Sequence, residues 1–322
     1  MEIEKATEIG FCFGVKRALN ILEKAIRDCG EVETLGPVVH NQQVVDKFSQ
    51  LGVKVVSNIN QLRSGVAVIP SHGVSPQVSE ELAVRGLKVV DTTCPNVRKA
   101  QQAAKELSKA GFWVIVFGDP THPEVRGILG WADQKGIATL DSETISKLDE
   151  LPQRLGLLSQ TTRNPAQFVS FVDTLAGSIL PQVEELRIVN TLCHITKRRQ
   201  AEALALAKKV SLMIVVGGRN SANTRCLAEV CSSAGTETHH IETAEDIEDT
   251  WLKGQRAVGV TTGTSIPDNA IEEVMLKLER IKRSLNAGLE IWHLSEPRGT
   301  EGSTHQLSLL DTIRTRVGTC HP

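Results

Sequence analysis

The sequence has little of what nucleic-acid-binding and membrane proteins depend on. It contains no Tyr, its formal net charge is −2, and it has no basic stripe with interleaved aromatic residues. Nucleic-acid binding therefore has little support. No apolar run approaches the roughly 18 residues needed to span a bilayer, and the N-terminal residues, Met1 to Lys5, lack the basic and apolar regions of a signal peptide. We expect a soluble, cytoplasmic protein.

Two short motifs are also absent. None of the seven cysteines forms a Cys-x-x-Cys pair, which structural zinc sites favour. In a cytoplasmic protein we expect these cysteines to be thiols or metal ligands rather than disulfides. No GxGxxG or other nucleotide fingerprint occurs, which argues against an internal flavin or nicotinamide.

One spacing is present three times. A cysteine at the end of a β-like run is followed 28 residues later by a polar residue at the end of another. The pairs are Cys12 with His40, Cys94 with His122, and Cys193 with Ser221. A repeated offset indicates one structural unit present in three copies. We therefore expect three thiols and three polar groups to converge on one centre.

The segments around these residues predict an α/β fold. After each cysteine comes a stretch with helical spacing, such as 97–110 or 197–209, and then a β-branched run. The predicted strands at this place are 34–39, 113–117 and 213–216. Short second strands are predicted at 53–56, 137–140 and 238–241. Strands that alternate with helices imply parallel βαβ sheets, which bind ligands beyond the carboxyl ends of their strands.

The length of 322 residues suits three α/β units of roughly 80 to 100 residues each. We divide the chain into a first lobe with the N-terminal strand, 1–95, a second lobe, 96–193, and a third lobe, 194–281. A C-terminal tail, 282–322, follows, with a possible strand at 289–294.

The remaining cysteines have simpler explanations than Cys12, Cys94 and Cys193. Cys29, Cys226 and Cys231 lie within predicted helices, where a small buried hydrophobic residue is sufficient reason for a cysteine. Cys320 lies in the polar tail. By contrast, the three repeated cysteines stand at strand ends.

Three thiolates from three units could hold zinc or an iron–sulfur cluster. Catalytic zinc keeps a position open for water, but its ligands usually include histidine or carboxylate. A cubane cluster takes one thiolate per iron, so three cysteines would leave one iron without a protein ligand. That iron would be free to act on a substrate oxygen as a Lewis acid, while the cluster supplies electrons.

The polar residues at the predicted strand ends suggest an anionic substrate. They are mostly neutral hydrogen-bonding groups, and several precede a predicted helix, whose N-terminal N–H groups favour phosphate or diphosphate. The set comprises His40, His72, His122, Thr161, Thr162, Ser221, Asn223 and Ser265. Glu124 adds the only carboxylate and could donate a proton.

Two other classes of protein remain open on these residues. A three-lobed phosphosugar-binding or isomerase protein would also hold phosphate with Ser, Thr and His at strand ends, but it would not need three aligned thiols. A zinc-dependent hydrolase with Glu124 as its general base would be colourless and would contain zinc.

The ordered motifs resemble one known family, from about residue 2 to residue 280. The matching segments are Gly10-Phe11-Cys12-Phe13-Gly14-Val15, Val39-His40-Asn41, Ser71-His72-Gly73-Val74, Asp91-Thr92-Thr93-Cys94-Pro95, His122-Pro123-Glu124, Ser159-Gln160-Thr161-Thr162, Arg199-Gln200, Asn220-Ser221 with Asn223, and Gly263 to Pro267. This pattern resembles the 4-hydroxy-3-methylbut-2-enyl diphosphate reductases.

The resemblance implies a fold and an activity. The fold is three similar lobes in a pseudo-threefold, trefoil-like arrangement around a central 4Fe–4S cluster, one per chain. The activity is reductive removal of the hydroxyl of an allylic diphosphate, which gives isopentenyl and dimethylallyl diphosphates in the last step of the methylerythritol phosphate route to isoprenoids. The electrons would come from a ferredoxin or flavodoxin.

The resemblance also implies roles for residues. Cys12, Cys94 and Cys193 would ligate the cluster. The diphosphate would be held by His40, His72, His122, Ser221, Asn223 and Ser265. Glu124 would supply the proton, Thr161 would relay it, and Thr162 would support the same network. The chain departs from the family pattern at Ala222, where a second serine is common.

Overall fold

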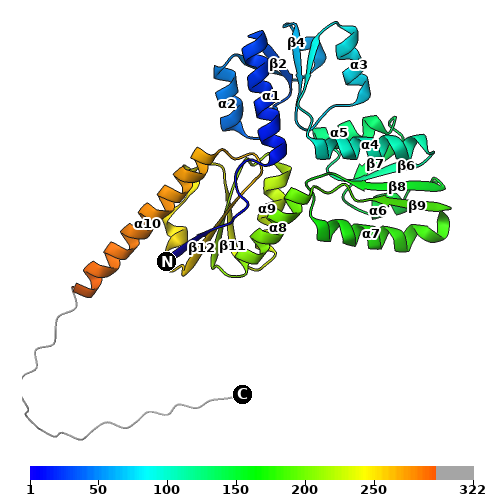
Figure 1. The fold of residues 1–322 in the computed structure, drawn as a ribbon. Coiled ribbons are helices and arrows are strands. Elements are labelled where there is room, and N and C mark those ends of the chain that lie inside the picture. Colours follow the sequence, from blue (N-terminus) through cyan, green and yellow to red (C-terminus); the bar gives the residue numbers. More distant parts are fainter. Residues whose placement is uncertain (295–322) are drawn as a thin grey trace, which may run out of the picture. The chain divides into compact units, whose positions relative to one another are not determined.

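The computed structural model describes the backbone of residues 1–294 and the side chains of residues 1–287. Residues Met1–Lys282 form one compact unit. This unit contains three separate four-stranded sheets, and every strand pairing within them is parallel. Each sheet with its helices forms one lobe (Figure 1). The α/β fold with three parallel lobes is therefore confirmed.

The first lobe has the strand order β3-β2-β4-β5. Its elements are α1 (Phe13–Cys29), β2 (Val32–Leu35), α2 (Gln42–Gln50), β3 (Val53–Val56), β4 (Val66–Ile69), α3 (Pro76–Val84) and β5 (Lys88–Asp91). Helices cover both faces of the sheet. Buried Leu19 and Leu22 of α1 pack with Val68 on one face, and Leu82 of α3 packs with Ala67 and Ile69 on the other.

The second lobe repeats this plan with the order β7-β6-β8-β9. Its elements are α4 (Pro95–Lys109), β6 (Trp113–Phe117), α5 (Pro123–Trp131), β7 (Gly136–Thr139), α6 (Glu143–Ser146), β8 (Arg154–Ser159), α7 (Pro165–Ile179) and β9 (Glu185–Val189). Alternate residues of β6 face opposite sides, as a strand requires. Val114 and Val116 join the core under α4 and α5, whereas Ile115 and Phe117 join the core under α7.

The third lobe has the order β11-β10-β12-β1. Its elements are α8 (His194–Ala207), β10 (Leu212–Val216), α9 (Ala222–Ser232), β11 (Glu237–Ile241), β12 (Ala257–Thr262) and α10 (Asp268–Leu294), with the N-terminal strand β1 (Glu2–Lys5) as the fourth strand. The blue N-terminal segment in Figure 1 runs into this lobe. β1 pairs only with β12 among the described strands, from Glu2 opposite Ala257 to Lys5 opposite Val260.

The position of β1 corrects our placement of the N-terminal strand in the first lobe. β1 occupies the edge that β5 and β9 occupy in the other two sheets. Each of these edge strands leads to one of the three repeated cysteines and then to the first helix of the next lobe. The boundaries near residues 95 and 193 remain our own division of the chain.

Two other local predictions are wrong. The strand predicted at 34–39 spans Val32–Leu35 instead, because Gly36 adopts a φ of +85° and Pro37 follows it. The segment predicted as a strand at 289–294 is the end of helix α10. The rest of the predicted tail, 295–322, lies outside the described residues. None of the helices described in residues 1–294 is long and apolar enough to cross a membrane.

Candidate functional site

The three repeated cysteines occupy equivalent positions. Cys12, Cys94 and Cys193 are the N-caps of α1, α4 and α8, which we call the thiol helices. Each cysteine donates its backbone N–H to a residue that follows the neighbouring strand. The acceptors are the carbonyls of Thr264 at 3.0 Å, Ser71 at 2.8 Å and Thr161 at 2.8 Å, respectively. The backbone therefore holds all three cysteines in the same way.

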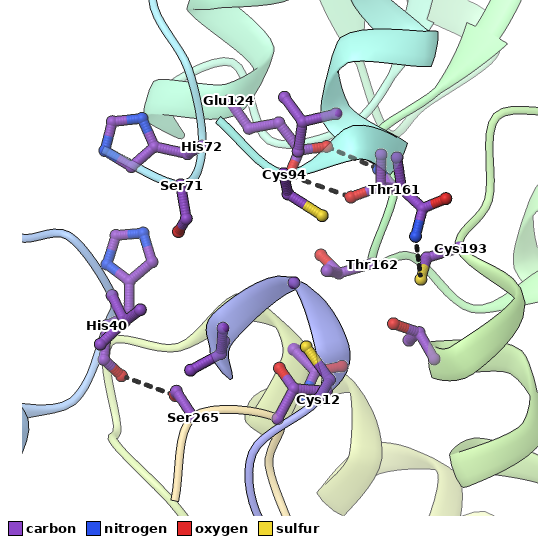
Figure 2. Close-up of a pocket in the computed structure, with 18 of the residues that line it drawn as sticks. Cys12, His40, Ser71, His72, Cys94, Glu124, Thr161, Thr162, Cys193 and Ser265 are labelled. Carbon is purple, nitrogen blue, oxygen red and sulfur yellow. Dashed lines mark hydrogen bonds between the residues drawn. The ribbon is translucent and has the colours of Figure 1, made fainter. Parts of the chain in front are cut away.

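The three cysteines line one pocket, and none of them forms a disulfide. Figure 2 shows their sulfurs around the same central space. Gly14 keeps part of this space open. A Cβ at this position would lie 2.6 Å from the sulfur of Cys94 and 3.8 Å from that of Cys12. Any side chain at residue 14 would therefore collide with the thiol of Cys94.

The spacing of the three cysteines does not match a site for one metal ion. No group of three His, Cys, Asp or Glu residues within the described part of the chain is compact enough to hold one. A cluster takes one thiolate on each of several irons, so it needs thiols that face a common space without being adjacent. Cys12, Cys94 and Cys193, with glycine rather than a side chain between two of them, fit that requirement.

At Cys12 and Cys94, the N–H groups at the start of the helix favour a thiolate, against the effect of burial. Burial raises the pKa of Cys12, while the N–H groups of Val15 and Gly14 lower it. Burial likewise raises the pKa of Cys94, and the N–H groups of Asn96 and Val97 oppose it. Helix N-terminal N–H groups stabilise negative charge on sulfur.

Asn96 makes a contact that sequence reasoning missed. Its Nδ2 donates to Cys193 Sγ at 3.1 Å, which links α4 to the thiol of the next lobe (Figure 2). Asn96 and Gly14 share one position in the repeat, two residues after a cysteine, and each approaches the sulfur of the next cysteine along the chain. This shared position in the repeat was the sequence signal from which the role of Asn96 could have been inferred.

The polar residues that lie 28 positions after the three cysteines also surround the pocket. His122 is the N-cap of α5, where its Nδ1 accepts the N–H of Glu124 at 3.1 Å. Ser221 is the N-cap of α9 and accepts the N–H of Thr224. His40 directly precedes Asn41, the N-cap of α2. Three helix N-termini therefore border the pocket. We call His40, His122 and Ser221 the polar ring.

The histidines at the pocket are close together and buried. The ring centroids of His40 and His72 lie 5.8 Å apart, and those of His40 and His122 lie 5.3 Å apart. Burial lowers the pKa of His72 to about 3 and that of His122 to about 4, and it also lowers the pKa of His40. These rings are therefore neutral at neutral pH, and each carries one N–H. That of His72 is on Nδ1, which donates to the carbonyl of Gly73 at 2.9 Å.

Some buried polar atoms at the pocket have no partner within the described residues. They are His40 Nε2, Thr162 Oγ1 and Asn223 Nδ2. Buried polar atoms in folded proteins are almost always hydrogen-bonded. Two nitrogens and a hydroxyl that converge without partners indicate a place where a ligand rich in acceptor oxygens would be satisfied.

Glu124 is buried and forms two hydrogen bonds with Thr161. Its side chain is 4% exposed. Its Oε1 accepts the N–H of Thr161 at 2.7 Å, and its Oε2 accepts the Thr161 hydroxyl at 3.1 Å. Burial raises the pKa of Glu124, although both bonds from Thr161 oppose the shift. A raised pKa lets a carboxyl keep its proton to a higher pH than an exposed carboxyl does, which suits a proton donor.

All twelve residues predicted from the sequence line this pocket. The third lobe also contacts the first across it, since Ser265 Oγ donates to the carbonyl of His40 at 3.3 Å (Figure 2). Sequence reasoning gave no role to the lining residues Ser71, Asn96, Thr196 and Thr264. Ser71, Thr161 and Thr264 are equivalent in the repeat, because each accepts the N–H of one cysteine.

Similar solved structures agree with the three-lobed fold. A structure of (E)-4-hydroxy-3-methyl-but-2-enyl diphosphate reductase is 37% identical and superimposes with a TM-score of 0.62, covering 87% of this chain and all of that one. The E-1-hydroxy-2-methyl-but-2-enyl-4-diphosphate reductase of Plasmodium falciparum gives a TM-score of 0.79 over 85% of this chain and 86% of that one. At 24% identity it supports the fold alone.

Sequence relatives cover nearly the whole described unit. A 4-hydroxy-3-methylbut-2-enyl diphosphate reductase of Dehalococcoides mccartyi strain CBDB1 is 49% identical over 281 residues, 87% of this chain and 99% of the relative. One from Geobacter metallireducens is 42% identical over 284 residues, with 87% and 98% covered. The family described as "LytB protein" matches residues 3–279. This chain therefore belongs to the LytB protein family.

Proposed function

We propose that this protein is a 4-hydroxy-3-methylbut-2-enyl diphosphate reductase. It removes the hydroxyl of that allylic diphosphate reductively, giving isopentenyl and dimethylallyl diphosphates in the last step of the methylerythritol phosphate route. The proposal rests on the family and on one observation above all. Three equivalent thiols and a buried acid–hydroxyl pair, Glu124 with Thr161, line the same pocket as polar atoms without partners.

Cys12, Cys94 and Cys193 would hold one 4Fe–4S cluster. When bound, the cluster supplies the two electrons of the reduction and an iron without a protein ligand that acts as a Lewis acid. The three helix N-termini favour thiolates at these positions. Gly14 leaves room beside Cys94, and Asn96 donates to Cys193.

The opposite side of the pocket would hold the diphosphate. The groups proposed to bind it are His40, His72, His122, Thr162, Ser221, Asn223 and Ser265. Because burial keeps the histidines neutral, His40 and His122 would act as hydrogen-bond donors rather than as fixed cations. The one N–H of neutral His72 already donates to the carbonyl of Gly73, so His72 would contact the diphosphate without donating to it. The unpartnered nitrogens of His40 and Asn223 are the donors that a diphosphate oxygen would satisfy.

Glu124 would deliver the proton for C–O cleavage. Reductive removal of a hydroxyl consumes two electrons and two protons, of which one leaves with the oxygen as water and the other ends on carbon. Glu124, whose pKa is raised by burial, would pass a proton through the Thr161 hydroxyl to the leaving oxygen. Burial of both groups keeps bulk water from competing with this transfer.

The electrons would come from a small acidic carrier of the ferredoxin or flavodoxin type. Each thiol helix carries two cations, at the fourth and fifth positions after its cysteine: Lys16 and Arg17, Arg98 and Lys99, Lys197 and Arg198. Helical spacing places these residues on the same side as the position directly after the cysteine, which in α1 is Phe13, 64% exposed. A cationic surface with an apolar residue beside the thiols suits such a partner. We propose the cytoplasm as the location.

An anaerobic preparation tests the proposed function. We expect a brown protein with about four irons per chain that converts the allylic diphosphate to both products when a chemical reductant is supplied. A colourless protein with stoichiometric zinc would instead support a zinc hydrolase that uses Glu124 as its base. A metal-free protein that isomerises a phosphosugar would also overturn the proposal.

A further inference from the structure

Helix α8 carries a buried arginine that the other two thiol helices lack. Arg199 lies six residues after Cys193, and its side chain is 2% exposed. The residues six positions after Cys12 and Cys94 are Ala18 and Ala100, both fully buried. At this position of the repeat, the third lobe therefore has a cation where the other two lobes have a methyl group.

Arg199 joins two chain segments that meet behind Cys12. Its Nη1 donates to the carbonyls of Gly10 at 3.0 Å, Thr262 at 2.9 Å and Gly263 at 2.7 Å. Gly10 lies two residues before Cys12, and Thr262 is the last residue of β12. One nitrogen therefore ties the loop that carries Cys12 to the end of β12, and it does so from the helix whose N-cap is Cys193.

The first and second lobes make the equivalent connection with a hydroxyl. Thr92, two residues before Cys94, donates its hydroxyl to the carbonyl of Ile69 at 2.6 Å. Thr191, two residues before Cys193, donates its hydroxyl to the carbonyl of Ser159. The counterpart of Ile69 and Ser159 in the third lobe is Thr262. Each of these three residues lies two positions before the residue whose carbonyl accepts a cysteine N–H.

The third lobe cannot use a threonine in this way. The equivalent residue is Gly10, whose φ of +74° disfavours a side chain, and a Cβ there would lie 3.1 Å from Asp268 Oδ1. Arg199 therefore takes over the bond to Thr262 that a threonine hydroxyl would otherwise make. This replacement also introduces a buried positive charge.

No carboxylate forms an ion pair with Arg199 among the side chains that the structure describes. Glu8 pairs instead with Arg198, and Glu202 accepts backbone N–H groups of the N-terminal segment. Burial lowers the pKa of Arg199, and the groups that oppose this are first the Cys12 thiol and then the carboxyls of Glu8 and Glu202. A buried charge without an ion pair is costly, so negative charge on the Cys12 side would stabilise Arg199 beyond what these two carboxyls supply.

We propose that Arg199 is a positioning residue of the metal centre, which fixes the Cys12 loop against the helix that begins at Cys193 and supplies positive charge beside the Cys12 sulfur. The proposal rests on the proposed function, in which both cysteines hold the cluster. Positive charge near a cluster favours its reduced, more negative form and so raises its reduction potential.

Two substitutions separate the two effects. Arg199→Met removes both the charge and the bonds, whereas Arg199→Lys keeps the charge but loses the guanidinium geometry. The matched control is Arg187→Met, which removes an exposed arginine of the second lobe that is paired with Glu185. The measurements are the cluster's reduction potential, followed by electron paramagnetic resonance, iron per chain, and hydrogen exchange of the amides at residues 10–12 and 262–264.

We expect Arg199→Met to shift the potential to more negative values, to lower iron per chain, and to speed exchange in both segments. Arg199→Lys should restore the potential toward wild type while exchange stays fast, and Arg187→Met should match wild type in all three measurements. Wild-type potential and exchange in Arg199→Met would overturn the proposal. If that variant does not fold, Arg199→Lys decides, since wild-type exchange in it would contradict the positioning role. A wild-type protein without iron would instead refute the proposed function, and the exchange measurement would still test the loop contact.

Discussion

The two rings of the pocket follow the same threefold repeat but differ in how strictly they keep it. We call Cys12, Cys94 and Cys193 the thiol ring. All three are cysteines at the N-cap of a helix, and each donates its backbone N–H to a carbonyl that follows the neighbouring strand. The polar ring keeps the position but changes the residue, with His40, His122 and Ser221 at its three places. The repeat therefore determines where groups stand, and substitutions within it determine what each lobe does.

The first and second lobes show this most clearly two residues beyond the polar ring. In the second lobe that residue is Glu124, 4% exposed and bonded to Thr161. In the first lobe it is Gln42, which is exposed and donates to Asp46 at 2.7 Å. The same backbone position thus holds a buried acid in one lobe and a surface amide in another.

The strictness of the thiol ring predicts that no member is dispensable. Cys94→Ser should lose most of its iron and all reductase activity, because a serine hydroxyl is a poor ligand for this cluster. The control is Cys29→Ser, which alters a cysteine at the end of α1 that contacts Lys88 rather than the pocket. Iron per chain and the visible spectrum measure the effect. Unchanged iron in Cys94→Ser would contradict ligation by this residue.

The divergence of the polar ring predicts a proton donor in one lobe only. Glu124→Gln should keep iron and substrate binding but lower turnover about 10² to 10⁴-fold, the usual contribution of a general acid. The reverse exchange at the equivalent position, Gln42→Glu, should leave turnover unchanged because that side chain is exposed. Anaerobic steady-state kinetics compare the two. Near-normal turnover in Glu124→Gln would place the proton source elsewhere.

The space between the three cysteines should affect iron binding as much as the cysteines themselves do. Gly14→Ala leaves every cysteine in place but puts a methyl group 2.6 Å from Cys94 Sγ, so iron per chain should fall. Gly177→Ala, within helix α7, meets no atom within 4 Å and should keep full iron and gain about 0.5–1 kcal/mol of stability. Full iron in Gly14→Ala would show that the sulfur of Cys94 can move aside.

The buried histidines should make the fold sensitive to acid. The pKa of His72 is about 3 in the folded protein and about 6.5 when unfolded, so its contribution to stability is full above about pH 6.5 and is lost as pH falls toward about 3. Within that window each such histidine adds about 1.4 kcal/mol per pH unit to the slope. His72→Gln should therefore show a shallower slope by about this amount in urea unfolding of the iron-free protein. The control is His194→Gln, which changes a histidine exposed to solvent. An unchanged slope in His72→Gln would contradict the burial argument.

The smallest expected effect concerns Ala222, where the resemblance led us to expect a second serine. Ala222 is the first residue of α9 and lines the pocket. Ala222→Ser would add one hydrogen bond from a hydroxyl to an anionic diphosphate oxygen, worth about 1.5 kcal/mol at the low end for a charged acceptor, and so lower KM by roughly tenfold at constant kcat. A higher KM would show that a backbone N–H already serves the oxygen in question. Lys208→Ala, at the C-terminal end of α8, is the control.

The sequence was sufficient to predict the three lobes and twelve of the residues that line the pocket. The 28-residue offset works because each copy places its cysteine and its polar residue at helix starts. It was not sufficient for β1, since the partner of an edge strand depends on long-range pairing rather than on local periodicity. It also missed Asn96, whose contact with Cys193 joins residues 97 positions apart. Neither Arg199 nor Gly10 shows its role until the lobes are compared in space.

The position of β1 also bears on how the protein matures. Of the strands that the structure describes, β1 is the first in the sequence and its partner β12 is the last, with paired residues about 255 positions apart. Until β12 and the residues after it are synthesised, the loop with Cys12 lacks the Thr264 carbonyl, and Arg199 lacks the carbonyls of Thr262 and Gly263. The Cys12 side of the pocket can therefore reach its native arrangement only after β12 has been synthesised, and products that end before it cannot complete the pocket.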